Sequence, residues 1–250
     1  MKKVVLQFLV MVLLFCATWF VLSKIDWPGI FKVEKAGKRT EEKLGDFYWD
    51  VLKKSEVEIL TDSVVLPIDT LLKRICAKNG ITRTKIKLHV VQNDEVNAFA
   101  LPNNHLVVYS GLIKACENEA EMAGILGHEI AHMEKNHVMK KLIKEAGLSV
   151  LISLSTGNGG PEVIKKTMKV LSSAAYDRKL ETEADLASVD YLMNAGINPE
   201  PFANFLYRFG MESNHLPNQL NWISTHPDSE ERAKKIFEYI KSKGSLKTAS

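Results

Sequence analysis

The first apolar segment of the chain lies at its N-terminus. After a short basic start, the run Val4–Leu22 is almost purely apolar and is interrupted only by Gln7 and Thr18. A helix needs about 20 apolar residues to cross a bilayer, whereas a cleavable signal peptide has an apolar stretch of roughly 7 to 15 residues. Because this run has the greater length and lacks the alternating polar residues of a core helix, it predicts a retained membrane anchor over residues 1–23.

Residues 24–60 are rich in charge, with aromatic side chains scattered between, and they predict a connector that docks on the main domain. Basic residues stand on both sides of the apolar run, so charge alone leaves the topology open. A basic start followed by an apolar segment normally acts as an export signal. We therefore expect the main domain, residues 61–250, on the extracytoplasmic side of a membrane, in the periplasm or envelope.

The main domain begins with mixed patterns and continues with helical ones. Asp69–Asn79 predicts a helix that Asp69 caps and that Asn79-Gly80 ends. Lys85–Val91 alternates apolar and polar residues, and Leu106–Tyr109 is a second β-rich run, preceded by a turn at 102–104. These runs predict a small antiparallel sheet. Almost everything after Ser110 has helical periodicity, so the fold class is α+β and mostly α-helical.

Composition narrows the range of functions. The chain has 250 residues, 46% of them hydrophobic and 25% charged, which excludes a disordered or low-complexity protein. Its 33 Lys+Arg against 30 Asp+Glu form no basic footprint, so no nucleic-acid partner is expected. Cys16, Cys76 and Cys116 form no C-x-x-C pair and are too few for a disulfide framework.

The motif His128-Glu129-Ile130-Ala131-His132 lies in a helical segment. Residues four apart share a helix face, so the two imidazoles can converge on one metal ion while Glu129 reaches a water bound to it. Zinc suits these ligands, takes three of them from the protein in catalytic sites and leaves a fourth position for water. The motif thus predicts hydrolysis with Glu129 as general base. The alternative is a core helix with two buried histidines.

A third ligand must come from elsewhere in the chain. A metzincin would have Gly at position 135 and His at position 138, and the presence of Lys135 and Val138 excludes that class. His137 points off the metal face, as a surface residue or as a support for a ligand. Glu181 and Asp185 lie four apart on one helix face, so Glu181 can bind the metal while Asp185 orients a neighbouring imidazole. Taken alone, such a charge cluster is more typical of a solvated helix face.

Several motifs in order resemble those of the HtpX and Oma-type zinc metallopeptidases, peptidase family forty-eight. They are His128–His132, Arg178–Asp185, the upstream Asn97–Pro102, and Ser224–Pro227 followed by Arg232. The resemblance covers about Thr61–Ile240 and implies a zincin fold of the gluzincin type, one zinc per chain, and Glu181 as the third ligand. The chain lacks the several membrane spans of the HtpX branch, so it is more similar to the single-anchor or periplasmic quality-control branch.

The resemblance also implies a substrate-binding strand. Asn97, Ala98, Phe99 and Ala100 resemble the edge strand on which such peptidases align a substrate backbone. An exposed edge offers unpaired N–H and C=O groups, so it binds extended peptide with little demand on its sequence. An ordinary strand is the alternative.

Three further residues are candidates for the site, His226 from the same resemblance and two arginines from their spacing in the sequence. His226 is similar to a family histidine near the metal, which acts either as an oxyanion donor or as a latch in the fourth zinc position. Replacing it with alanine would lower turnover in the first case and raise it in the second. A loop histidine with neither role is the alternative. Arg232 is placed to tie this loop to the domain or to pair with a carboxylate, and Arg178 is placed to hold Glu181.

Together these features predict a membrane-tethered zinc endopeptidase. Its expected partners are the membrane and unfolded or misassembled envelope proteins, which it would cut in exposed, extended segments. A different class, a holdase or assembly factor with a mainly structural or latent zinc site, is the alternative. A third hypothesis is an anchored helical protein that carries the motif by chance and binds no zinc. The substrate, the cleavage preference, the fate of residues 1–23 and the oligomeric state are left open.

Overall fold

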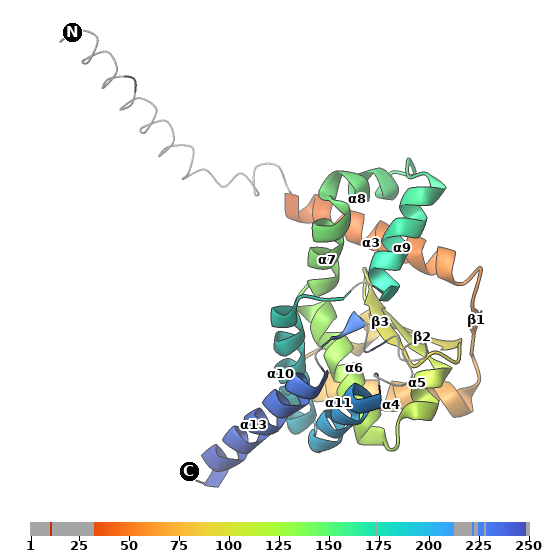
Figure 1. Ribbon diagram of the computed structural model, residues 1–250. Helices are drawn as coiled ribbons and strands as arrows, with labels where there is room; N and C mark the ends of the chain where they lie inside the picture. Colours follow the sequence, from red (N-terminus) through yellow and green to blue (C-terminus); the bar gives the residue numbers. More distant parts are fainter. Residues whose placement is uncertain are drawn as a thin grey trace, which may run out of the picture. The chain divides into compact units, whose positions relative to one another are not determined.

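The structure is a computed structural model that describes residues 33–173, 175–212, 225–227 and 229–248, together with Met11 and Trp222 (Figure 1). Contacts divide the chain into two units, residues 1–40 and residues 41–250, and each is taken by itself. Except for Met11, the anchor predicted over residues 1–23 lies outside the described residues. Within the described ranges, none of the helices has both the length and the hydropathy that a bilayer crossing requires.

The segment predicted as a connector contains a helix, α3 (Val33–Leu52), that continues from the first unit into the second. In the second unit it buries Leu44, Tyr48 and Trp49 in the hydrophobic core. The indole ring of Trp49 stacks on the imidazole of His89, with 3.5 Å between the ring centroids. The second part of the connector, residues 41–60, therefore belongs to the compact unit and helps to form its core.

The sheet has four strands, β1 (Val57–Glu58), β2 (Lys87–Gln92), β3 (Ala98–Leu101) and β4 (His105–Tyr109), in the order β1-β2-β4-β3. The prediction that it is antiparallel was wrong in one respect, because β2 and β4 pair in parallel, with Lys87 opposite His105. The other two pairs are antiparallel. The alternation of apolar and polar residues identifies strands but not which strands are neighbours. Here β4 lies between β2 and β3 in the sheet.

The turn between β3 and β4 confirms the expectation for residues 102–104. Asn103 and Asn104 adopt left-handed backbone conformations, with φ of 59° and 57°. Asparagine tolerates this region better than most residues, and two consecutive left-handed residues form the tight turn that matches the twist of a hairpin. The hairpin leaves β3 at the edge of the described sheet.

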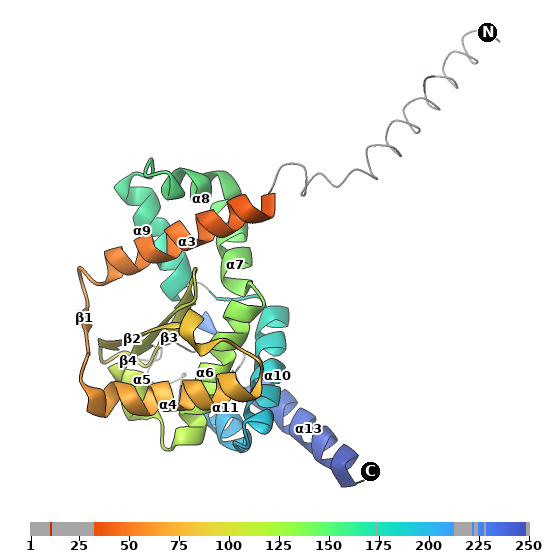
Figure 2. The ribbon, with the colours of Figure 1, turned by 180° about the vertical axis from the view of Figure 1, so that it is seen from behind.

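Helices make up the rest of the second unit (Figures 1 and 2). After the short 3₁₀ turn Arg83–Lys85 and the helix α4 (Asp62–Lys78) that precedes it, they are α5 (Ser110–Ala115), α6 (Glu119–Glu134), α7 (His137–Ala146), α8 (Leu148–Ser155), α9 (Pro161–Ser173), α10 (Arg178–Asn194), α11 (Glu200–Glu212) and α13 (Ser229–Thr248). The mostly helical α+β class is confirmed.

Helix α4 begins earlier than the sequence pattern suggested. Asp69 was expected to cap it, but the helix already starts at Asp62, and Asp69 lies in its middle. There the carboxylate pairs with Lys73 at 2.7 Å and with Arg83. A carboxylate inside a helix can pair with a lysine four residues on, so Asp69 does not need to mark the start of the helix. The predicted end is confirmed, because Asn79 is the C-cap and Gly80 has a φ of 67°.

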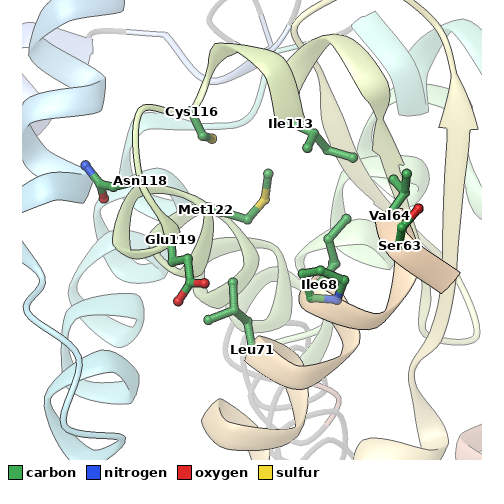
Figure 3. Close-up of a pocket in the computed structure, with 10 residues that line it drawn as sticks. Ser63, Val64, Ile68, Leu71, Ile113, Cys116, Asn118, Glu119 and Met122 are labelled. Atoms are coloured by element: carbon green, nitrogen blue, oxygen red, sulfur yellow. The ribbon is translucent and has the colours of Figure 1, made fainter.

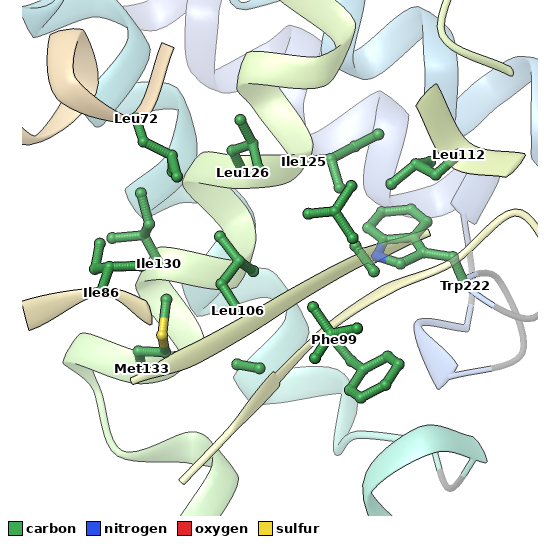
Figure 4. Packing of buried hydrophobic residues seen from close by; sticks show 14 of the residues in the cluster. Leu72, Ile86, Phe99, Leu106, Leu112, Ile125, Leu126, Ile130, Met133 and Trp222 are labelled. Carbon is green, nitrogen blue, oxygen red and sulfur yellow. The ribbon is translucent and has the colours of Figure 1, made fainter. Parts of the chain in front are cut away.

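Helix α6 lies in the centre of the second unit, between the sheet and the helices α10 and α11. Its apolar side chains Ile125 and Ile130 belong to the same buried core as the strand residue Leu106 (Figure 4). An apolar pocket of about 270 Å³ lies at the N-terminal end of α6, between α4 and α5. Met122 is part of its lining (Figure 3). All residues of α6 from Glu121 to Met133 are buried, so a polar cluster on this helix must find its partners inside the protein.

Candidate metal centre

Helix α6 brings the two histidines and the glutamate of the motif into the interior. Its N-terminus is capped by Asn118, whose side-chain oxygen accepts a hydrogen bond from the backbone N–H of Glu121 at 3.0 Å. Two turns further on, His128, Glu129 and His132 are completely buried. Buried polar side chains are expensive unless they are paired or bind a metal, so their partners decide what the site can do.

Helix α10 supplies the carboxylates. Asp177 caps it by accepting a hydrogen bond from the N–H of Lys179 at 3.0 Å, which places Glu181 in the first turn. The helix packs closely on α6 because Gly127 has no side chain, and a Cβ at that position would lie 2.7 Å from the hydroxyl oxygen of Ser188. The Ser188 hydroxyl donates to the carbonyl oxygen of Gly124 at 2.7 Å. This contact brings the start of α10 to the histidine face of α6.

Four side chains converge in a donor cluster, which we define as His128, His132, Glu181 and His226. The Nε2 atoms of His128 and His132 lie 2.9 Å apart, and an oxygen of Glu181 lies 3.3 Å from Nε2 of His132. Nδ1 of His226 lies 3.2 Å from Nε2 of His128 and 3.0 Å from both oxygens of Glu181.

These spacings match the needs of zinc. Ligand atoms bound to a tetrahedral zinc at about 2.0–2.1 Å lie about 3.3–3.4 Å from one another. All the ligand atoms of the donor cluster lie within 4.8 Å of one another, and imidazole with carboxylate is a set that zinc prefers. The cluster therefore fits one zinc ion.

Protonation within the donor cluster agrees with this fit. Burial holds the pKa of His132 well below its usual value, so the imidazole is neutral. Burial also raises the pKa of Glu181, but the neighbouring His226 and the Arg232 guanidinium outweigh it and hold the pKa of the carboxylate well below its usual range. A neutral imidazole and an ionised carboxylate are the forms that bind a metal.

The side chains of the donor cluster contact further polar side chains. Asp185 lies 2.9 Å from Nδ1 of His128, on the side of the ring that faces away from the cluster. His137 is fully buried, and its Nδ1 lies 3.0 Å from Nδ1 of His132, so it contacts that imidazole and is not a surface residue. Such contacts fix the orientation of an imidazole and the nitrogen that it presents to a metal.

Arg232 links the carboxylates of α10 to the loop that carries His226. It donates two hydrogen bonds of 2.7 Å to Asp185 and one of 2.9 Å to the carbonyl oxygen of His226. Its guanidinium also lies 2.8 Å from Glu181. Arg178, the other arginine predicted to hold Glu181, is exposed at the start of α10, and its predicted role stays a prediction.

The general-base candidate Glu129 stands beside the cluster. One of its oxygens, Oε1, accepts a hydrogen bond of 3.1 Å from the indole N–H of Trp222 and lies 3.4 Å from Nε2 of His226. The other oxygen, Oε2, is buried and has no hydrogen-bond partner among the described residues. One oxygen of Glu129 is therefore anchored while the other is available to a reacting group.

The predicted substrate strand is connected to this site through Trp222. Ala98, Phe99 and Ala100 belong to β3 at the edge of the described sheet, and Asn97 precedes it. The backbone N–H of Trp222 donates to the carbonyl oxygen of Val96 at 3.0 Å, which ties the segment containing Glu129's partner to the start of the strand. The side chains of β3 are buried, so a substrate would use the backbone of the strand.

Two residues of the site were not singled out in the sequence. Trp222 belongs to no motif, and Tyr176 stands alone before α10, so neither gave a local signal. The ring of Tyr176 stacks on that of His132 with 4.1 Å between centroids and on that of His226 with 5.5 Å. Ser224, which belongs to one of the quoted motifs, lies outside the described residues.

An α+β fold whose buried H-E-x-x-H helix shares a His-His-Glu cluster with a later helix defines a zincin-like metallohydrolase domain. The chain belongs to peptidase family M48, whose model matches residues 66–240. The resemblance found in the sequence is therefore confirmed.

Several named proteins are similar in sequence to this chain over 64–77% of its length. A beta-barrel assembly-enhancing protease of Yersinia pestis is 26% identical over 204 residues, which are 77% of this chain and 42% of that protein. The mitochondrial metalloendopeptidase OMA1 of Schizosaccharomyces pombe is 28% identical over 177 residues, 70% of this chain and 52% of that protein. The OMA1 metalloendopeptidase of Bos taurus is 30% identical over 175 residues, 64% of this chain and 34% of that protein. The chain thus spans about half, or less, of the length of these relatives.

Proposed function

We propose that the protein is a zinc-dependent endopeptidase with His128, His132 and Glu181 as metal ligands and Glu129 as general base. The observation that carries this proposal is the state of Glu129. One oxygen is anchored by Trp222, and the other is buried without a partner among the described residues, beside a donor cluster of zinc dimensions. A buried carboxylate oxygen without a partner is costly in a merely structural role, and it is what a proton acceptor requires.

In this proposal each residue of the site has a separate role in the reaction. Zinc, when bound, polarises the scissile carbonyl and makes water a nucleophile at neutral pH. Glu129 accepts a proton from the attacking water at Oε2 and delivers it to the leaving amine. Asp185 and Arg232 keep His128 and Glu181 in position, so the site need not reorganise during the reaction.

We further propose that His226 is a latch. Its Nδ1 lies 3.2 Å or less from ligand atoms of His128 and Glu181, a spacing that suits a fourth protein ligand. A histidine in that position would exclude the water that the reaction needs. His226→Ala should then raise turnover of a small peptide by tenfold or more, because it frees the fourth position. Unchanged zinc content with a lower turnover would instead identify His226 as an oxyanion donor.

The class of substrate follows from the strand and from the relatives. The backbone of β3 can pair with an extended chain of almost any sequence, which suits unfolded or misassembled proteins. The names of the relatives refer to beta-barrel assembly and to mitochondria. We infer that the protein acts in quality control of envelope proteins, held at a membrane by residues 1–23.

The test uses the full chain in detergent micelles. Zinc per chain is measured by mass spectrometry, and hydrolysis is followed with a reduced, unfolded protein as substrate. About one zinc per chain is expected in the wild type and in Glu129→Gln, and the variant should lose 10²- to 10⁴-fold in rate, the usual share of a general base. Glu181→Ala is the matched variant that should lose the zinc.

Two results would contradict the proposal. Absence of zinc from the folded wild type would exclude a metallopeptidase. If Glu129→Gln bound zinc and cleared client proteins from cells as well as the wild type, the holdase or assembly-factor alternative would be the better description. The His226→Ala variant provides an active reference if the wild type is latent.

A further inference from the structure

A second pocket, with a volume of about 180 Å³, shares Tyr176 with the surroundings of the donor cluster. It is formed between α7 and the beginning of α10, which lie next to each other in Figures 1 and 2. Its lining consists of Lys140, Lys141, Lys144 and Glu145 on α7, followed by Ala175, Tyr176, Asp177, Lys179 and Leu180. We call it the lysine pocket. The proposed mechanism uses none of these residues.

Lys141 is the unusual member of the lysine pocket. It lies one helical turn after His137 on the buried face of α7, and only 4% of its surface is exposed. Its Nζ lies 3.9 Å from the centroid of the Tyr176 ring and has no hydrogen-bond partner among the described residues. An ammonium group carries three N–H donors, so a buried one without an acceptor is costly to maintain.

The charge on Lys141 persists in spite of this burial. Burial lowers its pKa to about 8, against the opposing fields of Glu129 and Glu181. A pKa of that value leaves the group mostly protonated at neutral pH. The Tyr176 ring offers a cation–π contact, but it accepts none of the N–H donors in the way an oxygen does. The natural complement of this group is an anion.

The surroundings of Lys141 also favour an anion. Lys140, Lys144 and Lys179 stand exposed around the mouth of the pocket. Of the two acidic residues in the lining, Asp177 already accepts the N–H of Lys179 as a helix cap and lies 4.0 Å from Lys144. The pocket therefore has four lysines against one capping aspartate and one exposed glutamate.

Tyr176 forms a common wall between the lysine pocket and the metal centre. One side of the ring stacks on His132, while the Lys141 ammonium lies over the same ring. The backbone N–H of Tyr176 donates to the carbonyl oxygen of Thr225 at 3.1 Å, next to His226. A group bound by Lys141 would thus lie one aromatic ring away from the donor cluster.

We propose that the lysine pocket is a substrate subsite that binds a carboxylate group of the peptide, with Lys141 as the residue that recognises it. This inference rests on the proposed peptidase function. The carboxylate could come from a glutamate or aspartate side chain within the peptide or from its C-terminus. Both sources present the same acceptor oxygens to the ammonium, so the experiment must separate them.

Peptide binding is measured by fluorescence anisotropy with the full chain, loaded with zinc and carrying Glu129→Gln so that peptides stay intact. The probes are N-acetylated ten-residue peptides in matched pairs. In one series a single glutamate moves along an amidated peptide, and glutamine replaces it in the partner peptide. In the other series the same peptide carries a free C-terminus or an amide.

The variants are Lys141→Met and Lys114→Met. Methionine keeps the length of the lysine stem and removes the charge, so Lys141→Met should fold with an unchanged or higher Tm. Lys141→Gln is the second variant if methionine disturbs the packing. Lys114 is an exposed lysine on α5, paired with Asp94 at 2.9 Å, and its replacement changes the net charge equally at a distant place.

The wild-type site should bind at least one carboxylate peptide about ten- to a hundredfold more tightly than its neutral partner, as a charge-assisted hydrogen bond allows. Lys141→Met should abolish this preference and leave binding of the neutral peptide unchanged, and Lys114→Met should retain it. The series that shows the preference identifies the source of the carboxylate.

Three results would overturn the inference. The first is that the carboxylate peptide and its neutral partner bind with affinities within threefold of each other in every pair. The second is that neither peptide of any pair binds. The third is that the preference for the carboxylate peptide survives in both Lys141 variants. The proposed function can fail separately. Carboxylate binding without hydrolysis by the enzyme with an intact Glu129 would refute the peptidase but not the subsite, whereas equal hydrolysis of charged and neutral peptides would refute the subsite alone.

Discussion

Replacement of Arg232 by methionine should destabilise the whole site. The guanidinium is almost fully buried and contacts two carboxylates, those of Asp185 and Glu181, together with the carbonyl oxygen of His226. Asp185 and Glu181 are themselves nearly inaccessible to solvent. Methionine would fill much of the space but would leave both carboxylates without their positive partner.

The size of the effect follows from this burial. Removal of one partner from a buried ion pair typically costs about 3–5 kcal/mol, because an uncompensated charge remains in the interior. Both partners of Arg232 are buried, so solvent gives little relief. In a domain of this size, about 1 kcal/mol corresponds to a change in Tm of roughly 2–4 °C, so we expect a decrease of about 6–20 °C. The loop with His226 should also lose its attachment.

The assay is thermal and guanidinium-induced unfolding of the zinc-free and zinc-loaded full chain. Lys235→Met is the matched control, because Lys235 lies on the same helix in an exposed ion pair with Glu231 and should cost less than about 1 kcal/mol. Adding Asp185→Leu to Arg232→Met should recover part of the loss, since it removes one of the stranded charges. An Arg232→Met variant within 1 kcal/mol of the wild type would refute the reasoning.

Two further predictions concern packing and pH. Gly124→Ala should lower the free energy of unfolding by about 1–3 kcal/mol in denaturant unfolding, because the new Cβ would lie 2.3 Å from Cβ of Phe202. The control Gly37→Ala has no atom within 4 Å of the new Cβ and should be neutral or stabilising. Equal effects of the two substitutions would contradict this account of the α6–α11 contact. Burial lowers the pKa of His105 from 6.5 to about 4, so the unfolded chain binds more protons in this window, and stability should fall by up to about 3 kcal/mol as the pH decreases through it. His105→Gln should flatten that slope, and an unchanged pH profile would exclude His105 as its source.

Local patterns in the sequence predicted the features that depend on near neighbours. The spacing of His128 and His132 places two imidazoles on one face of any α-helix, and the spacing of Glu181 and Asp185 does the same for two carboxylates. Asn79-Gly80 ends a helix and Asn103-Asn104 makes a turn for reasons of backbone conformation alone. The start of α4 was missed because a carboxylate such as Asp69 can serve equally as a cap or as an ion-pair partner.

The sequence by itself therefore determined the H-E-x-x-H motif, the mostly helical class and, through its resemblance, the family. Only the tertiary structure decided which residues from distant segments complete the site. His226 meets His128 across 98 positions of the chain, and Trp222 meets Glu129 across 93. Such contacts depend on how closely whole helices pack, as at Gly127 and Ser188, and on which strand lies beside which, as in the parallel pair of β2 and β4. Periodicity reports the face that a side chain occupies, whereas its partner on that face is set by the packing of the complete domain.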